Sequence, residues 1–464
     1  MTYEPNAITE EHPLRPFPEL PAPAERHTIA TVLRRPRFSL LVLGQTVSQF
    51  GDKLHHMALI ALVGAGASTN TGGLELAKLS VVFTAPVVLF GPLVGALVDR
   101  WNKRRTMLVT DLLRAVIVGL IPWLFVATGR LWPVYVAAFF VFLLGIFFNA
   151  AKMALIPDLV DRDQLLPANA ALTFIGRFAT VGGIVGGGII IGMTYWRRFG
   201  WSDYAAGFYL DSVSYLISVL TLAGIILGTR RLDRTGAGSG TTDPAASEVK
   251  RRLRHLVGDV RQTLRVVWRD PGLRFVFGSL VLLSLFASTV YVAMTYSVQT
   301  VMGRGTRGVS ELGGILGAGM IVGSLMIGTV GSRWEKRQTI MICAAIIGLM
   351  MVVGGVFFSF TIFAPVAFVG GALLGPMMVA QDTLLHEYAP ATSRALIFST
   401  KDLIVGAVFM SSALSVGGGI YLLGRLGIAE PYRLALILLG LLICAAGVAG
   451  EVAVLRRVRS GRSA

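Results

Sequence analysis

Twelve long apolar stretches, separated by shorter polar segments, dominate the chain. Each has about 20 or more residues, enough for a helix to cross roughly 30 Å of hydrocarbon. A membrane β-barrel would instead show short alternating segments. We therefore predict an all-α integral membrane protein with twelve transmembrane helices. The stretches lie at roughly 38–64, 76–98, 106–128, 133–156, 165–194, 204–228, 273–298, 309–331, 337–359, 361–386, 393–423 and 431–455.

The composition supports the same class. Hydrophobic residues make up 54% of the 464 residues and charged residues only 15%, which is too little charge for a soluble protein of this size. The 54 glycines suit close helix packing in lipid. Cys343 and Cys444 lie inside apolar stretches, so we expect buried thiols. The cysteine spacing indicates neither a disulfide framework nor a metal site, and we expect no cofactor.

The net charge of +16 has two interpretations, nucleic-acid binding or the positive-inside rule. With both termini inside, the predicted cytoplasmic segments hold most of the 42 Lys and Arg residues. This asymmetry favours the positive-inside rule. We expect a multi-pass protein of the cell (inner) membrane with both termini cytoplasmic, surrounded by lipid and without a nucleic-acid partner.

A repeated motif divides the chain into two halves. The segment 95–104 (GALVDRWNKR) follows the second stretch, and 328–337 (GTVGSRWEKR) follows the eighth. Matching motifs at equivalent places indicate duplication and a substrate path between the halves. We predict two pseudo-symmetric six-helix bundles. The predicted organisation is a cytoplasmic N-tail (1–37), an N-terminal bundle (38–228), a linker with a basic amphipathic helix (229–272), a C-terminal bundle (273–455) and a cytoplasmic C-tail (456–464).

The first copy of the motif, Gly95-x-x-x-Asp99-Arg100-x-Asn102-Lys103-Arg104, resembles the loop 2–3 signature of the major facilitator superfamily. Asn102 stands in the usual Gly position, and Asn also tolerates a left-handed backbone. Within the superfamily the chain resembles drug, macrolide and siderophore exporters and the related bacterial lysophospholipid transporters. This second resemblance depends on residues 49–52 (QFGD), 151–160 (AKMALIPDLV) and 167–170 (PANA). It implies a substrate path that alternates between the two sides of the membrane.

The first predicted helix carries a polar stripe, with Lys53 and His55 beside it. Ionisable groups inside a bilayer are functional candidates, and a carboxylate near a histidine could exchange protons. We expect this stripe and Arg177 of the fifth helix to meet in a wet cleft between the bundles. A structural Asp52–Lys53 or Asp52–Arg177 pair is the alternative, and a divalent-metal site is a further one. The stripe consists of Gln45, Gln49, Asp52 and His56.

Other charged residues fall into two groups. In the eleventh helix Lys401 and Asp402 are candidates for the path, of which we expect one to face it, because adjacent residues do not face each other. We assign the second group to a cytoplasmic gate or to the loop motif, where the charges would stabilise one facing state. Asp111 and Arg114 would join the loop network, and Asp211 has no assigned role. The second group consists of Gly95, Asp99, Arg100, Lys103, Arg104, Asp111, Arg114, Lys152, Asp382 and His386.

The glycine clusters 182–188 and 417–419 contain no Walker sequence, so we interpret them as sites of close helix packing. No nucleophile elbow or zinc motif is present, and we expect no enzyme activity. The first hypothesis is a monomeric secondary active transporter that exports a small amphipathic substrate, coupled to protons, by alternating access. The alternatives are a lysophospholipid flippase with Arg177 or Lys152 on the phosphate, and a non-transporting membrane scaffold or sensor.

Overall fold

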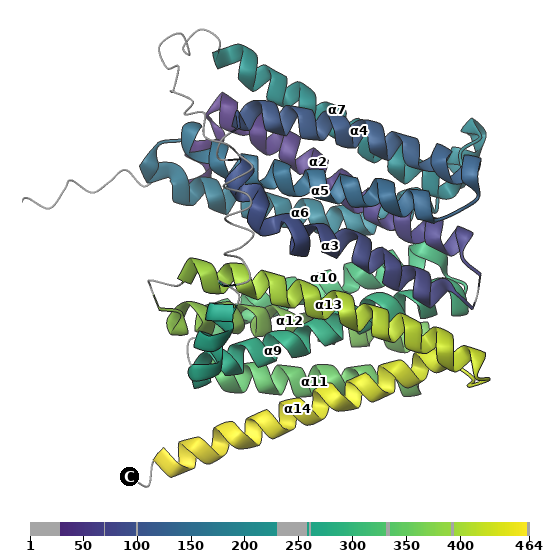
Figure 1. Cartoon of the computed structure of the whole chain (residues 1–464), viewed down its shortest axis with the longest axis vertical. Helices are drawn as coiled ribbons and strands as arrows, with labels where there is room; N and C mark the ends of the chain where they lie inside the picture. The colour runs from purple at the N-terminus through teal and green to yellow at the C-terminus, as the bar shows by residue number, and fades with distance from the viewer. Residues whose placement is uncertain are drawn as a thin grey trace, which may run out of the picture.

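The computed structural model of the chain describes residues 28–68, 70–98, 101–229, 258, 261–330, 335–390 and 394–461. Within these ranges the regular structure is helical, without a strand. Figure 1 shows the helices running side by side in two bundles. The first bundle contains α2 (Pro36–Gly66), α3 (Gly72–Val98), α4 (Lys103–Thr128), α5 (Trp132–Leu155), α6 (Leu165–Ile191) and α7 (Asp203–Thr229), with short helices α1 (Ile29–Leu33), η1 (Ile156–Asp158), η2 (Arg162–Gln164) and η3 (Thr194–Phe199) at its ends.

The second bundle begins with α9, which continues through two π-helical turns. The other helices of this bundle are long and end within a few residues of the predicted stretches. Its elements are α9 (Pro271–Thr289), η5 (Val290–Met294), η6 (Ser297–Val301), α10 (Gly305–Val330), α11 (Lys336–Val356), α12 (Phe360–Tyr388), α13 (Arg394–Arg425) and α14 (Pro431–Gly461). The predicted fold class is confirmed. In the part of the chain that the structure describes, eleven helices are long and apolar enough to span a membrane. The polar stripe of α2 keeps that 31-residue helix out of this set.

Local signals set the helix ends. Proline occupies the first turn of α2 and α9, where its missing N–H costs nothing. The Asp270 carboxylate accepts a hydrogen bond from the Leu273 N–H at 2.8 Å, which caps α9. Gly129, with φ of +62°, ends α4 in the left-handed conformation that glycine adopts without strain.

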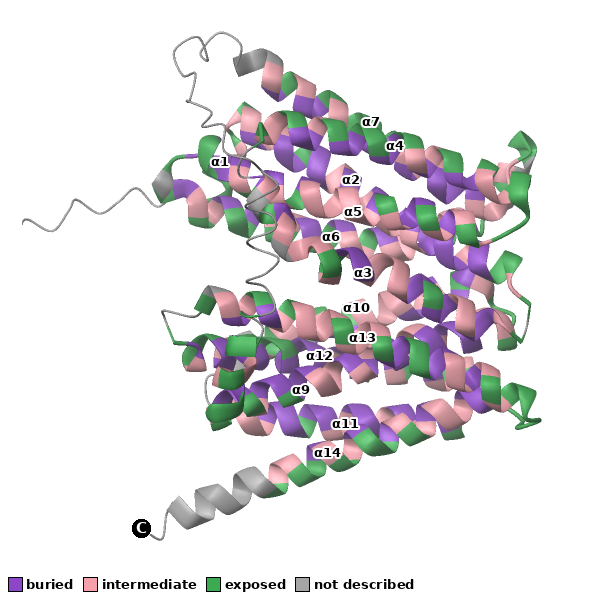
Figure 2. Cartoon of the chain, in the orientation of Figure 1, coloured by how far each residue is buried: buried purple, intermediate pink, exposed green. Residues whose placement is uncertain are grey.

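Apolar side chains also cover the outside of the bundles. Figure 2 shows exposed residues along the outward faces of α4, α7 and α14. Trp123 is 63% exposed, Leu220 71% and Leu438 56%. In water, such broad apolar exposure would cause aggregation, whereas a lipid environment accommodates it. The exposed belts therefore face the membrane.

The two sides of the membrane differ in how closely the bundles approach. We call the end with the 229–272 connection the linker side and the other end the hairpin side. α6 packs on α10, and α3 packs on α13. A Cβ added to Gly188 of α6 would overlap Ser310, and one added to Gly417 of α13 would overlap Ala77. The Gln299 amide donates a hydrogen bond to the Ile60 carbonyl at 2.8 Å. These contacts hold the bundles together toward the hairpin side.

Figure 1 shows the two bundles diverging toward the linker side. A Cβ added to Gly91 or Gly95 of α3 would find nothing within 4 Å. The structure is therefore closed at the hairpin side and open at the linker side. Close packing at the glycine clusters is seen at Gly188 and Gly417, while Gly418 and Gly419 lie in open space. Of the expected amphipathic linker helix, residues 261–269 are helical; 230–257, the tail residues 1–27 and the last residues 462–464 lie outside the described ranges.

Candidate functional site

A cavity of about 400 Å³ lies between the two bundles. α2, α3 and α6 form one wall, and α9 with η5, η6, α10, α12 and α13 forms the other. Most of the lining is apolar, such as Met57, Ile184, Leu312 and Leu316. An apolar cavity with a few polar groups is typical of small-molecule sites. It suits the hydrophobic part of an amphipathic substrate.

An aromatic cluster from both bundles borders this cavity. Phe83 of α3 and His56 of α2 come from the first bundle, and Tyr291 of η5 and Phe409 of α13 from the second. The ring centres of Phe83 and Tyr291 lie 5.3 Å apart, and those of His56 and Tyr291 lie 5.9 Å apart. Such pairs stabilise each other modestly and have preferred geometries. A molecule in the cavity would touch rings that move with different bundles.

The π-helical turn η5 shapes the second wall. Val290, Tyr291 and Met294 of this turn line the cavity. π-turns inside α-helices are frequent at functional sites because they displace side chains from the regular helical pattern. The Tyr291 hydroxyl is buried without a hydrogen-bond partner. It can therefore donate to a polar atom of a bound molecule.

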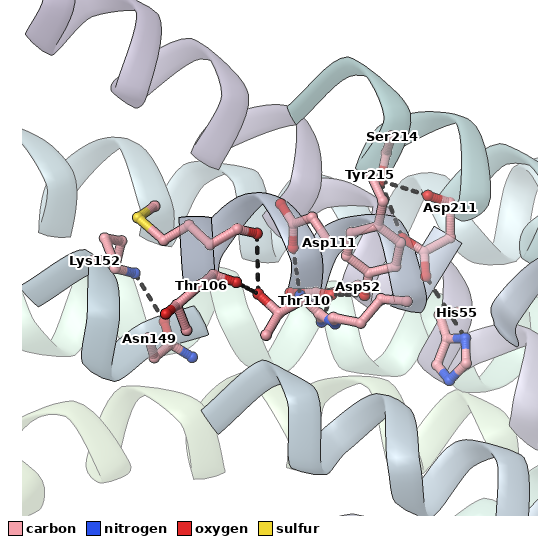
Figure 3. Close-up of polar contacts among 12 residues, drawn as sticks. Asp52, His55, Thr106, Thr110, Asp111, Asn149, Lys152, Asp211, Ser214 and Tyr215 are labelled. Atoms are coloured by element: carbon pink, nitrogen blue, oxygen red, sulfur yellow. Dashed lines mark hydrogen bonds and ion pairs between the residues drawn. The ribbon is translucent and has the colours of Figure 1, made fainter. Parts of the chain in front are cut away.

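Asp52, at the middle of α2, turns into the first bundle. Its carboxylate lies 2.6 Å from the Arg114 guanidinium of α4 and accepts a hydrogen bond from the Tyr215 hydroxyl of α7 (Figure 3). The expected meeting of Asp52 with Arg177 in the cleft is therefore wrong. The physical reason is that Arg114 lies at the same depth on α4, and that α2 and α4 both pack on α7 in the same bundle. The Asp52 side chain is still 32% exposed.

Two further carboxylates complete a buried charge cluster around Arg114. Asp111 lies 3.4 Å from the guanidinium, and Asp211 of α7 lies 3.6 Å from His55 Nδ1. Both carboxylates are fully buried. The cluster thus holds three carboxylates and one guanidinium, which contacts two of them and also stacks on the Tyr215 ring at 4.1 Å. Because unpaired buried charge is costly, the cluster can be neutral only if it binds protons.

Rings connect the charge cluster to the central cavity. The His55 ring packs edge-on against Phe142 of α5, with centres 5.8 Å apart. Phe142 in turn lies 5.9 Å from Phe83, which contacts Tyr291 in the other bundle. A change in the packing of His55 can therefore reach the cavity through two intervening rings.

A second, polar cavity of about 250 Å³ lies between α2, α5 and α6. It lies toward the linker side, where the bundles diverge. Gln45 and Gln49 line it from α2, Lys152 from α5, and Thr173 and Arg177 from α6. The predicted stripe thus divides: its two glutamines face this cavity, Asp52 enters the cluster, and His56 borders the central cavity.

The comparisons with known proteins agree with this architecture. A family model described as the Major Facilitator Superfamily matches residues 41–400. The chain belongs to the Major Facilitator Superfamily. It is 23% identical to the uncharacterized MFS-type transporter YfiS of Bacillus subtilis (strain 168), over 87% of this chain and 91% of YfiS. It is 27% identical to the multidrug efflux pump Tap of Mycolicibacterium fortuitum, over 71% of this chain and 76% of Tap.

Solved structures show the same fold. A bacterial homologue of the iron transporter ferroportin in an inward-facing state aligns with a TM-score of 0.63 at 14% identity, over 89% of this chain and 98% of that chain. The chain is thus a multi-pass membrane transporter of the superfamily, not an enzyme, and an efflux pump is among its relatives.

The superfamily loop motif lies partly outside the described ranges, because Asp99 and Arg100 belong to the undescribed residues. Gly95 is exposed. Lys103, one residue before Arg104 at the start of α4, forms an ion pair with Asp158 at 3.2 Å. Asn102 has φ of −69° and caps α4 with its side chain, so the expected left-handed turn does not form there.

Asp111 and Arg114 do not join this loop network. They lie two to three turns into α4 and belong to the buried cluster around Asp52. Tyr215 was not predicted from the sequence as a site residue, and Asp211 was given no role. A signal was present, because Asp211 and Tyr215 are four residues apart on α7 and so share one helix face.

The candidates of the second bundle meet at its linker side. Lys401 lies 3.3 Å from Asp382 of α12 and 3.8 Å from Asp402. The expectation that Lys401 and Asp402 do not face each other is wrong, because the long lysine side chain reaches its neighbour. The His386 ring packs on Phe398, with centres 4.6 Å apart. These contacts lie within one bundle, close to the linker-side opening.

Proposed function

We propose that this transporter exports an amphipathic small molecule by proton antiport, with the linker side in the cytoplasm. The observation that carries the proposal is the pairing of an apolar cavity between the bundles with a charge cluster of three carboxylates and one guanidinium. The cavity supplies a site for substrate, and the cluster supplies groups that can gain and lose protons. The excess of Lys and Arg in the predicted cytoplasmic segments supports the orientation.

The connection between the two sites suggests how coupling works. Asp52 is the most exposed carboxylate of the cluster, so it can exchange protons with water in the linker-side opening. Its protonation would weaken its ion pair with Arg114, which joins α2 to α4. Rocking of the bundles then exposes the cavity to the other side. Substrate and protons would move in opposite directions.

Replacement of Asp52 by Asn tests this proposal. The variant keeps the size of the side chain and its hydrogen bond with Tyr215, but it cannot carry the exchanged proton. In vesicles with an acidic lumen, the wild type should accumulate a fluorescent lipophilic dye. In Asp52→Asn we expect the gradient-dependent rate to fall by at least about tenfold, which corresponds to 1.4 kcal/mol.

The matched control is Glu311→Gln, which removes a carboxylate from a surface pair with Arg307 at 3.0 Å. Surface pairs of this kind contribute about 0–1 kcal/mol, so this variant should transport like the wild type. Equal gradient-driven rates in Asp52→Asn and the wild type would contradict the coupling role of Asp52.

A further inference from the structure

Three cations lie on packed helices of the first bundle: Lys53 of α2, Lys152 of α5 and Arg177 of α6. Lys152 and Arg177 line the polar cavity, and Lys53 packs over Gly183 of α6. Among the residues that the structure describes, none of the three has a carboxylate within ion-pair distance. The carboxylates of the same bundle interior, Asp52 and Asp111, pair with Arg114 instead. Charge is thus segregated, with an acidic cluster inside the bundle and a basic wall beside it.

Lys152 is the most informative of these cations. It is only 6% exposed, and its ammonium donates a hydrogen bond to the Asn149 side-chain oxygen at 2.9 Å. A buried ammonium whose single hydrogen-bond partner is neutral is costly, because among the described residues no carboxylate contacts it directly. It borders the 250 Å³ polar cavity, which Arg177 lines from α6 and whose lining includes no Asp or Glu. The cavity has the charge and the room for an anion.

The polar cavity and the central apolar cavity adjoin along two helices. On α2, Gln49 lines the first and His56 the second, which are two turns or about 10 Å apart on one face. On α6, Thr180 lines the polar cavity and Ile184 lines the central cavity; the two residues are one turn, or about 6 Å, apart. Lys53 packs over Gly183 between them. One molecule can therefore reach from the polar cavity into the apolar one.

We propose that the exported substrate is an amphiphile with an anionic headgroup, a carboxylate or phosphate, held between Lys152 and Arg177 with its apolar part in the central cavity. This inference rests on the proposed function and narrows the substrate class. Arginine presents a planar fork that matches both anions, and lysine presents a point charge. The glutamine and threonine side chains around them can add hydrogen bonds to the same oxygens.

Transport of matched probes tests the inference. Fluorescent alkyl probes with identical tails would end in a phosphate, a carboxylate, a neutral amide or a trimethylammonium, and a labelled lysophosphatidate would represent the lipid source. In proteoliposomes the wild type should move the two anions at least about tenfold faster than the amide, since a hydrogen bond to a charged group contributes about 1.5–3 kcal/mol. The double variant Lys152→Gln/Arg177→Gln should lose this preference.

The amide probe distinguishes loss of anion recognition from misfolding: the double variant should still move the amide, while the ratio of anion to amide rates falls to about one. Arg130→Gln, at an exposed hairpin-side position, should keep the anion preference. Movement of the free alkyl phosphate or of the lysophosphatidate supports the inference and identifies the source of the anion. Faster movement of the amide or the trimethylammonium probe overturns the inference and leaves the proposed function standing. Movement of no probe overturns both.

Discussion

Replacing Arg114 by Met should destabilise the first bundle by about 3–5 kcal/mol, the range for removing one partner of a buried ion pair. Arg114 is 6% exposed and contacts Asp52 at 2.6 Å, Asp111 at 3.4 Å and the face of Tyr215. Without the guanidinium, Asp52 and Asp111 would lose the cation that they contact in the bundle interior. Denaturant-induced unfolding of the purified protein, followed by its loss of helix signal, measures the change.

A second substitution makes this prediction specific to charge. In Arg114→Met/Asp52→Asn one of the stranded carboxylates is also removed, so part of the lost stability should return. Arg130→Met, at an exposed position, should unfold like the wild type. Unchanged stability in Arg114→Met would mean that the cluster does not hold α2, α4 and α7 together.

Replacing Gly188 by Val should prevent closure of the hairpin side and reduce transport by at least about tenfold, a cost of 1.4 kcal/mol or more. A Cβ at this position would overlap Ser310 of α10, and the helix backbones on both sides cannot yield easily in a packed interface. The variant should therefore populate states that are open at the hairpin side. A cysteine at position 310, with Cys343 and Cys444 replaced by Ala, would report the opening through faster labelling by a membrane-impermeant thiol reagent.

Gly182→Val is the matched control. It adds the same side chain to the same helix, but its Cβ would meet Phe50 only at 3.8 Å, an ordinary contact. It should leave labelling at position 310 and the transport rate unchanged. Slow labelling in Gly188→Val, equal to that of the Gly182→Val protein, would show that this contact does not control the hairpin-side closure.

The fold could be predicted from the sequence because hydrocarbon imposes one requirement on every spanning segment. Backbone groups must be paired within the segment, so each long apolar stretch becomes a helix. The polar stripe on α2 was also readable, since its spacing places Gln45, Gln49 and His56 near one face. Helical periodicity gives the face of a residue on its own helix, however, and does not say which helix lies opposite.

The partners of the stripe show this limit. The sequence suggested two partners for Asp52, Lys53 and Arg177, but in the structure Asp52 pairs with Arg114. The choice depends on α7 packing against both α2 and α4 at the depth of Asp52, which is a property of tertiary structure. The same holds for Phe83 and Tyr291. Their ring centres lie 5.3 Å apart although the residues belong to different bundles. No local sequence pattern distinguishes these two residues from the other aromatic residues of the apolar stretches.

Proton release on substrate binding tests the coupling most directly. Purified protein in weakly buffered solution would be mixed with the amphiphile that it transports fastest, and the pH of the solution would be followed. Exchange of substrate for protons predicts a release of protons that saturates with substrate binding and disappears in Asp52→Asn, although the variant still binds. Saturable binding to the wild type without any release of protons would contradict antiport through this cluster.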